Sequence, residues 1–109
     1  MKLIHDIINA KILNLEKIHD YLQLGTDKGT INIYNHSFYY ENECMYDISS
    51  LSEEKIKYHI IINAFYEELK HIKLELDNGI VMVVSIAEED YLSPEAMNIH
   101  SCSGEIIVL

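Results

Sequence analysis

The chain has 109 residues, of which 18 are Asp or Glu and eight are Lys or Arg, so its formal net charge is -10 at pH 7. An electrostatic field of this sign repels phosphate backbones and anionic lipid, and it attracts basic surfaces. The composition therefore argues against nucleic acid and membrane partners and favours a basic protein partner, although such a charge also serves solubility alone.

Length and residue content predict one domain covering residues 1–109. Hydrophobic residues make up 49% of the chain, and there are only one Pro and four Gly. This hydrophobic content is enough to build a core without a disulfide or a metal ion. No apolar run reaches the ~18 residues of a membrane span, and His5 and Asp6 interrupt the N-terminal segment where a secretion signal needs apolar residues. We therefore expect a cytoplasmic protein with Cys44 and Cys102 reduced, a bridge between them being the alternative.

The first half of the chain predicts a short helix followed by strands. Residues 2–9 place Leu and Ile on one side of a helix. From residue 22 to residue 33, apolar and polar residues alternate around a turn at residues 26–29, which is typical of an antiparallel sheet with one solvated face. Another strand is expected around residues 38–40, followed by a loop.

The segment from residue 52 to residue 72 fits two structures. Ser52 followed by two glutamates resembles a helix start, and the apolar residues that follow fit a helical stripe. However, residues 56–62 alternate and are rich in residues that favour strands. We predict a strand at residues 55–62 and a short helical turn near residues 64–69.

The last third predicts two hairpins. Asp77-Asn78-Gly79 lies between two apolar runs, and Asn-Gly tolerates the positive φ angles of a type I′ turn. Beyond a turn at Ser93-Pro94-Glu95, strands are expected near residues 97–100 and at residues 105–109.

The two halves of the chain share a pattern. Residues 11–35 and residues 55–86 each begin with Lys-Ile and continue with a Leu-x-Leu pair, a Gly turn and an alternating run. Two explanations stay open, a duplicated three-strand unit or two hairpins that share a common pattern. The fold class is accordingly α+β, mainly antiparallel β, with a short N-terminal helix.

Catalytic and metal motifs are not found in the sequence. Six histidines and two cysteines include no CxxC, HxxxH or HExxH spacing, and His100-Ser101-Cys102 provides only two ligands. Neither cysteine lies in a recognisable nucleophile motif, and the glycines are too scattered for a phosphate loop. The sequence therefore indicates no catalytic residue, metal ligand or cofactor, and the chain is not expected to be an enzyme.

The C-terminal run EEDYLSPEAMNIHSCSGEIIVL, preceded by LELDNGIVMVVSI, resembles small bacterial immunity proteins encoded beside polymorphic or contact-dependent growth inhibition toxins. The resemblance covers residues 11–35 and 55–109, with Gly turns and Pro94-Glu95-Ala96 as its motifs. Such relatives often carry Trp after Pro-Glu-Ala, whereas this chain has Met97 and no Trp.

The resemblance implies a protein that binds and neutralises a cognate toxin domain, such as a nuclease with a basic active site. An acidic surface would cover that site, and exposed tyrosines would strengthen the contact. The residues predicted to bind are Glu88, Glu89 and Asp90, and then Tyr39, Tyr40, Glu41 and Glu43. The protein itself is expected to be a monomer or a homodimer. The alternative functions are a self-associating interaction module without a toxin partner and a small enzyme that uses Cys102 or a histidine.

Overall fold

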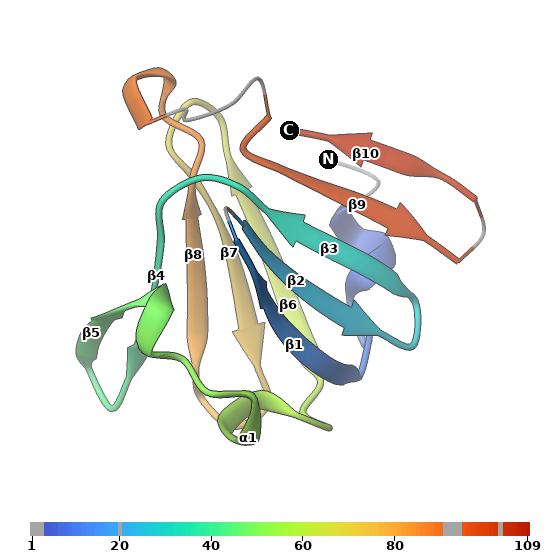
Figure 1. Ribbon diagram of the computed structural model, residues 1–109, viewed down its shortest axis with the longest axis vertical. Helices are drawn as coiled ribbons and strands as arrows, with labels where there is room; N and C mark the ends of the chain where they lie inside the picture. The colour runs from blue at the N-terminus through green and yellow to red at the C-terminus, as the bar shows by residue number, and fades with distance from the viewer. Residues whose placement is uncertain (1–3, 20, 91–94, 103) are drawn as a thin grey trace.

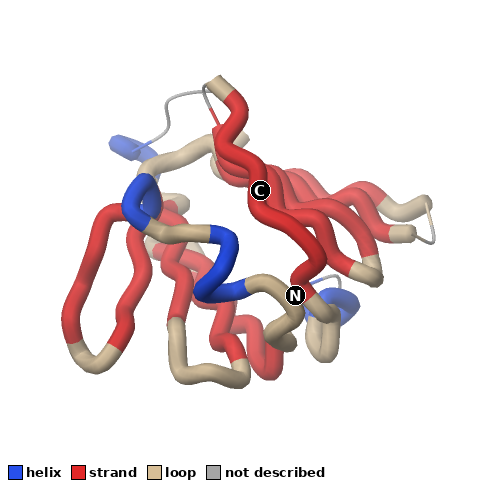
Figure 2. Tube along the Cα trace, turned by 60° about the horizontal axis from the view of Figure 1, so that its bottom comes forward, coloured by secondary structure: helices blue, strands red, loops and turns tan. Residues whose placement is uncertain are grey.

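Two antiparallel β-sheets pack against each other in this protein (Figures 1 and 2). The computed structural model describes residues 4–19, 21–90, 95–102 and 104–109. Within them the strand orders are β1-β2-β3-β9-β10 in sheet 1 and β5-β4-β8-β7-β6 in sheet 2. The predicted mainly antiparallel β fold is therefore confirmed.

The helices and strands in the described part of the chain are all short. The strands are β1 (Ile12–Ile18), β2 (Tyr21–Thr26), β3 (Gly29–Ile33), β4 (Ser37–Glu41), β5 (Cys44–Asp47), β6 (Ile61–Glu67), β7 (His71–Leu76), β8 (Val81–Ser85), β9 (Met97–Ser101) and β10 (Ile106–Val108). The helical elements are the 3-10 turns η1 (Ile4–Ile7), η2 (Ile48–Ser50) and η3 (Glu88–Asp90), and one turn of α-helix, α1 (Glu53–Ile56).

Alternation of side chains builds one core between the sheets. β2 and β7 each bury every second residue, because successive side chains of a strand point to opposite faces. The buried apolar residues of both strands belong to a single cluster that contains side chains from both sheets. The period of two that the sequence displays in these segments is therefore the pattern that the core requires.

The chain crosses between the sheets twice. Strands β1–β3 form a three-stranded meander in sheet 1, and β6–β8 form another in sheet 2. After β3 the β4–β5 hairpin pairs with β8 of the other sheet, and after β8 the β9–β10 hairpin pairs with β3. Each sheet thus contains strands from both halves of the chain.

A reciprocal set of backbone hydrogen bonds joins the two meanders. Asn9 N donates to Ile61 O (2.7 Å), and Tyr58 N donates to Ile12 O (2.6 Å). In the same junction Ile61 N donates to Ala10 O, and Ile12 N donates to the carbonyl of residue 59, both at 2.9 Å. Each bond therefore has a counterpart with the two halves exchanged.

The local geometry on either side of this junction corresponds as well. Asn9 and Tyr58 both have positive φ angles, 73° and 70°. Register shifts follow at residues 12–14 of β1 and at residues 61–63 of β6. These correspondences describe geometry, and a common origin of the halves stays a prediction.

The prediction for the segment from residue 52 to residue 72 was wrong at both elements. Residues 53–56 form α1, not the start of a strand, and Glu53 Oε2 ties this turn to β1 by accepting from Leu15 N at 3.0 Å. The positive φ of Tyr58 then separates α1 from β6. Residues 61–67 are a strand because they pair with β7 along their whole length, so the helical turn expected at residues 64–69 does not form.

Other predicted elements are confirmed with changes. The helix expected at residues 2–9 is a 3-10 turn at residues 4–7, and residues 1–3 lie outside the described part of the chain. Strands form at all three other predicted places, as β4, β9 and β10. The predicted loop after β4 is wrong, because β5 returns antiparallel to β4. Pro94 also lies outside the described residues.

The type I′ geometry predicted for residues 77–79 is found instead between β4 and β5. At residues 76–80 only Gly79 has a positive φ, 90°, and Gly79 N donates to Leu76 O at 3.1 Å. The hairpin is confirmed, but the type I′ geometry is wrong for it, since that turn needs positive φ at both central residues. Asn42 and Glu43, between β4 and β5, have that signature, with φ of 52° and 68°.

We predict that Gly29→Ala destabilises the protein by about 2–4 kcal/mol, because a Cβ there would lie 2.2 Å from the carbonyl oxygen of His100, in a backbone with φ of 145°. Gly79→Ala is the matched control. It also has a positive φ but meets no atom within 4 Å, so it should cost only about 1 kcal/mol. Urea unfolding measures both, and equal losses would contradict the prediction.

Candidate partner-binding surface

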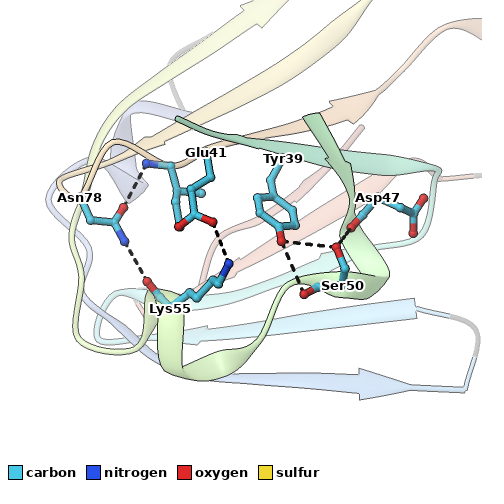
Figure 3. Close-up of polar contacts among 7 residues, drawn as sticks. Tyr39, Glu41, Asp47, Ser50, Lys55 and Asn78 are labelled. Atoms are coloured by element: carbon cyan, nitrogen blue, oxygen red, sulfur yellow. Dashed lines mark hydrogen bonds and ion pairs between the residues drawn. The ribbon is translucent and has the colours of Figure 1, made fainter. Parts of the chain in front are cut away.

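The two predicted tyrosines of β4 lie on opposite faces of sheet 2. The Tyr39 side chain is 2% exposed, its ring stacks on Tyr46 with centroids 5.3 Å apart, and its hydroxyl lies 3.3 Å from Ser50 Oγ (Figure 3). Tyr40 is 38% exposed on the outer face. The alternation predicted that one of them faces away from the core. Because Tyr39 is buried, it supports the hairpin from within and is removed from the set of predicted contact residues.

The outer face of sheet 2 carries an apolar surface that the sequence did not indicate. Cross-strand pairing aligns Phe65, Lys73, Val83 and Phe38 in one row across β6, β7, β8 and β4. A second row aligns further residues of β8, β4 and β5. We call the apolar members of these rows the outer aromatic face: Phe38, Tyr40, Met45, Phe65, Val81 and Val83, of which Val83 is only 3% exposed.

Several members of the outer aromatic face are accessible. Met45 is 62% exposed and Phe65 is 46% exposed. The rings of Phe38 and Tyr40 meet edge to face, with centroids 5.6 Å apart. Aromatic residues and Met in such an arrangement are typical of the centres of protein interfaces, since they offer a large contact area at low entropic cost.

An open hollow of about 470 Å³ continues this face over β6 and β7. Phe65, Tyr66 and Glu67 line it from β6, and His71, Lys73 and Glu75 line it from β7. The hollow therefore combines an aromatic wall with charges of both signs. It could receive one side chain of a partner that docks on the outer aromatic face.

The predicted acidic residues lie at opposite ends of sheet 2. Glu43 is exposed at the tip of the β4–β5 hairpin, beside the end of β4 that pairs with the start of β8. Glu88, Glu89 and Asp90 form η3, beyond the other end of β8 (Figure 1). The structure does not bring the two groups together, but both flank the outer aromatic face.

Two of the predicted carboxylates have a structural partner. Glu41 Oε1 lies 2.7 Å from Lys55 Nζ, and this hydrogen bond is the main reason why the pKa of Lys55 is raised. Asp90 Oδ2 accepts from Ser85 Oγ at 2.6 Å. Glu41 and Asp90 therefore hold local structure, and Glu43, Glu88 and Glu89 are the more available negative charges.

A polar junction fixes the position of the hairpin (Figure 3). Lys55 of α1 binds Glu41, and its carbonyl oxygen accepts from Asn78 Nδ2 at 2.8 Å. Asn78 Oδ1 in turn accepts from Ile80 N at 3.1 Å. α1 thereby connects the end of β4 with the β7–β8 turn, and this connection sets the orientation of the outer aromatic face.

Asp47 caps η2 at the base of the hairpin. Its Oδ2 accepts from Ser49 Oγ (2.5 Å) and from Ser49 N (2.9 Å). These hydrogen bonds lower the pKa of Asp47, and His36, 3.9 Å away, adds a smaller effect in the same direction. The carboxylate is thus held in its charged form beside the outer aromatic face.

The two cysteines considered for catalysis lie in or next to strands of different sheets. Cys44 and Cys102 are both free and exposed, one in β5 and the other after β9. His100 pairs with Thr30 and Ile106 in sheet 1. Among the residues that the structure describes, no three His, Cys, Asp or Glu side chains are grouped so that they could hold a metal ion.

Comparison of the chain with models of protein families, with curated proteins and with solved structures gives no match. Within the described residues, no helix is long and apolar enough to cross a membrane.

We predict that Glu43→Gly stabilises the fold by about 1 kcal/mol, because a non-Gly residue in the left-handed region costs about 1–2 kcal/mol and Gly regains part of this. Glu105→Gly serves as the control, since residue 105 does not have a positive φ. Thermal or urea unfolding gives the difference. Loss of stability in Glu43→Gly would show that the side chain has a role that its exposed position does not indicate.

For Asp47 we predict a pKa below its ordinary value that rises in Ser49→Ala, because the largest cause of the shift is removed. His36→Gln should have a smaller effect. A lowered folded-state pKa stabilises the fold above the unfolded value of about 4, and the stabilisation is lost as pH falls through the folded value. NMR titration of the carboxyl carbon measures all three, and an equal or larger shift in His36→Gln would contradict the assignment.

Proposed function

We propose that this chain is a cytoplasmic binding protein that neutralises a basic protein partner, and that the partner is a toxin domain as the family resemblance implies. The observation that carries the proposal is the outer aromatic face, an accessible apolar surface with acidic groups at both of its ends. The partner would present a basic surface, such as the substrate groove of a nuclease.

The acidic groups would act mainly on the association rate. A net charge of -10 attracts a basic partner over distances near the Debye length, about 8–10 Å at physiological ionic strength. Fast association is useful to an inhibitor, because free toxin acts until it is bound. Glu43, Glu88 and Glu89 are placed to steer the partner toward sheet 2.

The aromatic residues would act mainly on the dissociation rate. Removing Tyr40, Met45 and Phe65 from water contributes about 25 cal/mol per Å² of apolar area, although association costs reduce the net gain. Central aromatic contacts of this kind commonly dominate the binding free energy. In this proposal the outer aromatic face sets the specificity and the lifetime of the complex, and the acidic groups beside it set the rate at which the two proteins meet.

Self-association is the second candidate function, and a separate surface favours it. β10 is an edge strand of sheet 1, and its Ile106 and Val108 side chains are 60% and 58% exposed. Exposed apolar edge strands pair readily with other chains. A homodimer joined at β10 would leave the outer aromatic face free.

We also propose that the two meanders with their exchanged hairpins arose by duplication. The reciprocal hydrogen bonds of residues 9–12 and 58–61 support this, as do the matching positive φ angles. Residues 1–50 expressed alone should then form a two-fold dimer in which hairpins are exchanged. Light scattering and NMR test this, and a fragment that stays monomeric would contradict it.

Co-expression with the C-terminal domain of the protein encoded immediately upstream tests the proposed function. We expect rescue of growth and a stoichiometric complex. Tyr40→Ala with Phe65→Ala should weaken the complex at least 30-fold, as the loss of about 2 kcal/mol or more at an interface centre implies. Ile106→Ala with Val108→Ala is the control, because both residues are apolar and more exposed than Tyr40 and Phe65, and this variant should bind normally. If the substitutions in β10 abolish rescue and those in sheet 2 do not, the binding site lies at β10 and the proposal for the outer aromatic face is wrong.

Salt dependence tests the electrostatic part separately. In the complex, Glu88→Gln with Glu89→Gln should slow association several-fold at low ionic strength and change dissociation little. Glu16→Gln with Glu105→Gln is the control, because both residues belong to the sheet 1 side of the molecule. Association rates that do not change with salt would remove the steering role.

A further inference from the structure

The end of sheet 1 carries a cation where the core pattern calls for an apolar residue. On β1 the inward positions pair with inward positions of β2, so that Leu15 lies opposite Leu24. Two residues further along, Lys17 lies opposite Leu22, which in turn pairs with Ile33 of β3. Since paired residues project to the same face, Lys17 is directed toward the space between the sheets.

A cavity of about 290 Å³ opens at this position. Its lining comes from the end of sheet 1, from the β3–β4 connection and from η2: Lys17, His19, Tyr21, Leu22, Ile33, Tyr34, Asn35, Ile48 and Ser49. Leu22 and Ile33, 5% and 3% exposed, form an apolar floor. Among the described residues that line it none is an acid, although the chain has more than two carboxylates for each Lys or Arg.

The polar groups of the cavity are held in place before any ligand binds. Lys17 Nζ donates to the carbonyl oxygen of Ser49, which leaves two of its three N–H groups for a ligand. Ser49 is itself fixed by two hydrogen bonds to Asp47. The rings of Tyr21 and Tyr34 pack with centroids 5.1 Å apart at one side. Side chains that are already ordered lose little entropy on binding.

We infer that this cavity binds a small organic carboxylate, with its apolar part on Leu22 and Ile33 and its carboxylate on Lys17. An apolar lining with a few placed polar groups is typical of small-molecule sites. The volume is about ten times the roughly 30 Å³ that one water occupies in the liquid, so it fits a body about the size of one aromatic ring and a short chain. This site is separate from the outer aromatic face, and its existence does not depend on the proposed toxin partner.

The test uses the full chain and 4-phenylbutyrate as the probe, with 4-phenylbutanamide as its uncharged counterpart. In ¹H–¹⁵N NMR spectra we expect saturable shifts at the amides of Leu22, Ile33 and Ser49, with a Kd on the order of 100 μM, since an open cleft gives modest affinity. The amide probe should bind about ten-fold more weakly, because it lacks the charge that Lys17 recognises.

Variants separate recognition from damage to the fold. Lys17→Met should raise the Kd about ten-fold, whereas Lys17→Arg, which keeps the charge, should stay within a few-fold of the parent. Lys28→Met, in the β2–β3 turn at the other end of β2, removes another lysine that donates to a backbone carbonyl and should leave the Kd unchanged. The inference is overturned if the two probes bind with equal affinity, or if the shifts are confined to another surface. It is also overturned if no shift appears at 10 mM probe, which is about a hundred times the expected Kd. A Kd that is unchanged in Lys17→Met, measured on a variant with a well-dispersed spectrum, would overturn it as well.

Discussion

The fold depends on the junction in which residues 9–12 and 58–61 exchange backbone hydrogen bonds. Because each meander begins there, the junction fixes the position of the first strand of one meander relative to the first strand of the other. The hairpins then exchange, so that β4 completes the sheet of the second half and β9 completes that of the first. Neither half has a complete sheet by itself, and we expect unfolding to be cooperative for that reason.

This exchange also determines where the proposed recognition surface lies. The β4–β5 hairpin joins β8 and thereby places Phe38 of the first half beside Val83 of the second half, in the same row as Phe65. The outer aromatic face is thus made by both halves of the chain. A substitution that weakens the junction would displace this surface without altering any of its residues. Its effect on binding would therefore resemble that of substituting a contact residue, unless folding is measured as well.

Charge is arranged differently at the two candidate sites. Around sheet 2, Glu43, Glu88 and Glu89 are exposed, which suits the proposed basic partner. At the mouth between the sheets, Lys17 and His19 line a cavity to which no described lining residue contributes an acid. The two proposed sites therefore differ in the sign of their charge, and screening by salt limits the influence of each group to about 10 Å.

The sequence by itself determined the sheet class, most strands and the separation of Tyr39 from Tyr40, since a period of two and turn residues are local signals. It also indicated the acidic groups, because charge is a property of composition. It could not determine the pairing of β4 with β8 or of β9 with β3, which depends on contacts between residues far apart in the chain. Residues 52–67 were misassigned because tertiary pairing with β7 outweighs local propensity. For the same reason Phe65, Met45 and Lys17 gained their proposed roles only in the tertiary structure, where neighbouring strands decide which face each side chain occupies.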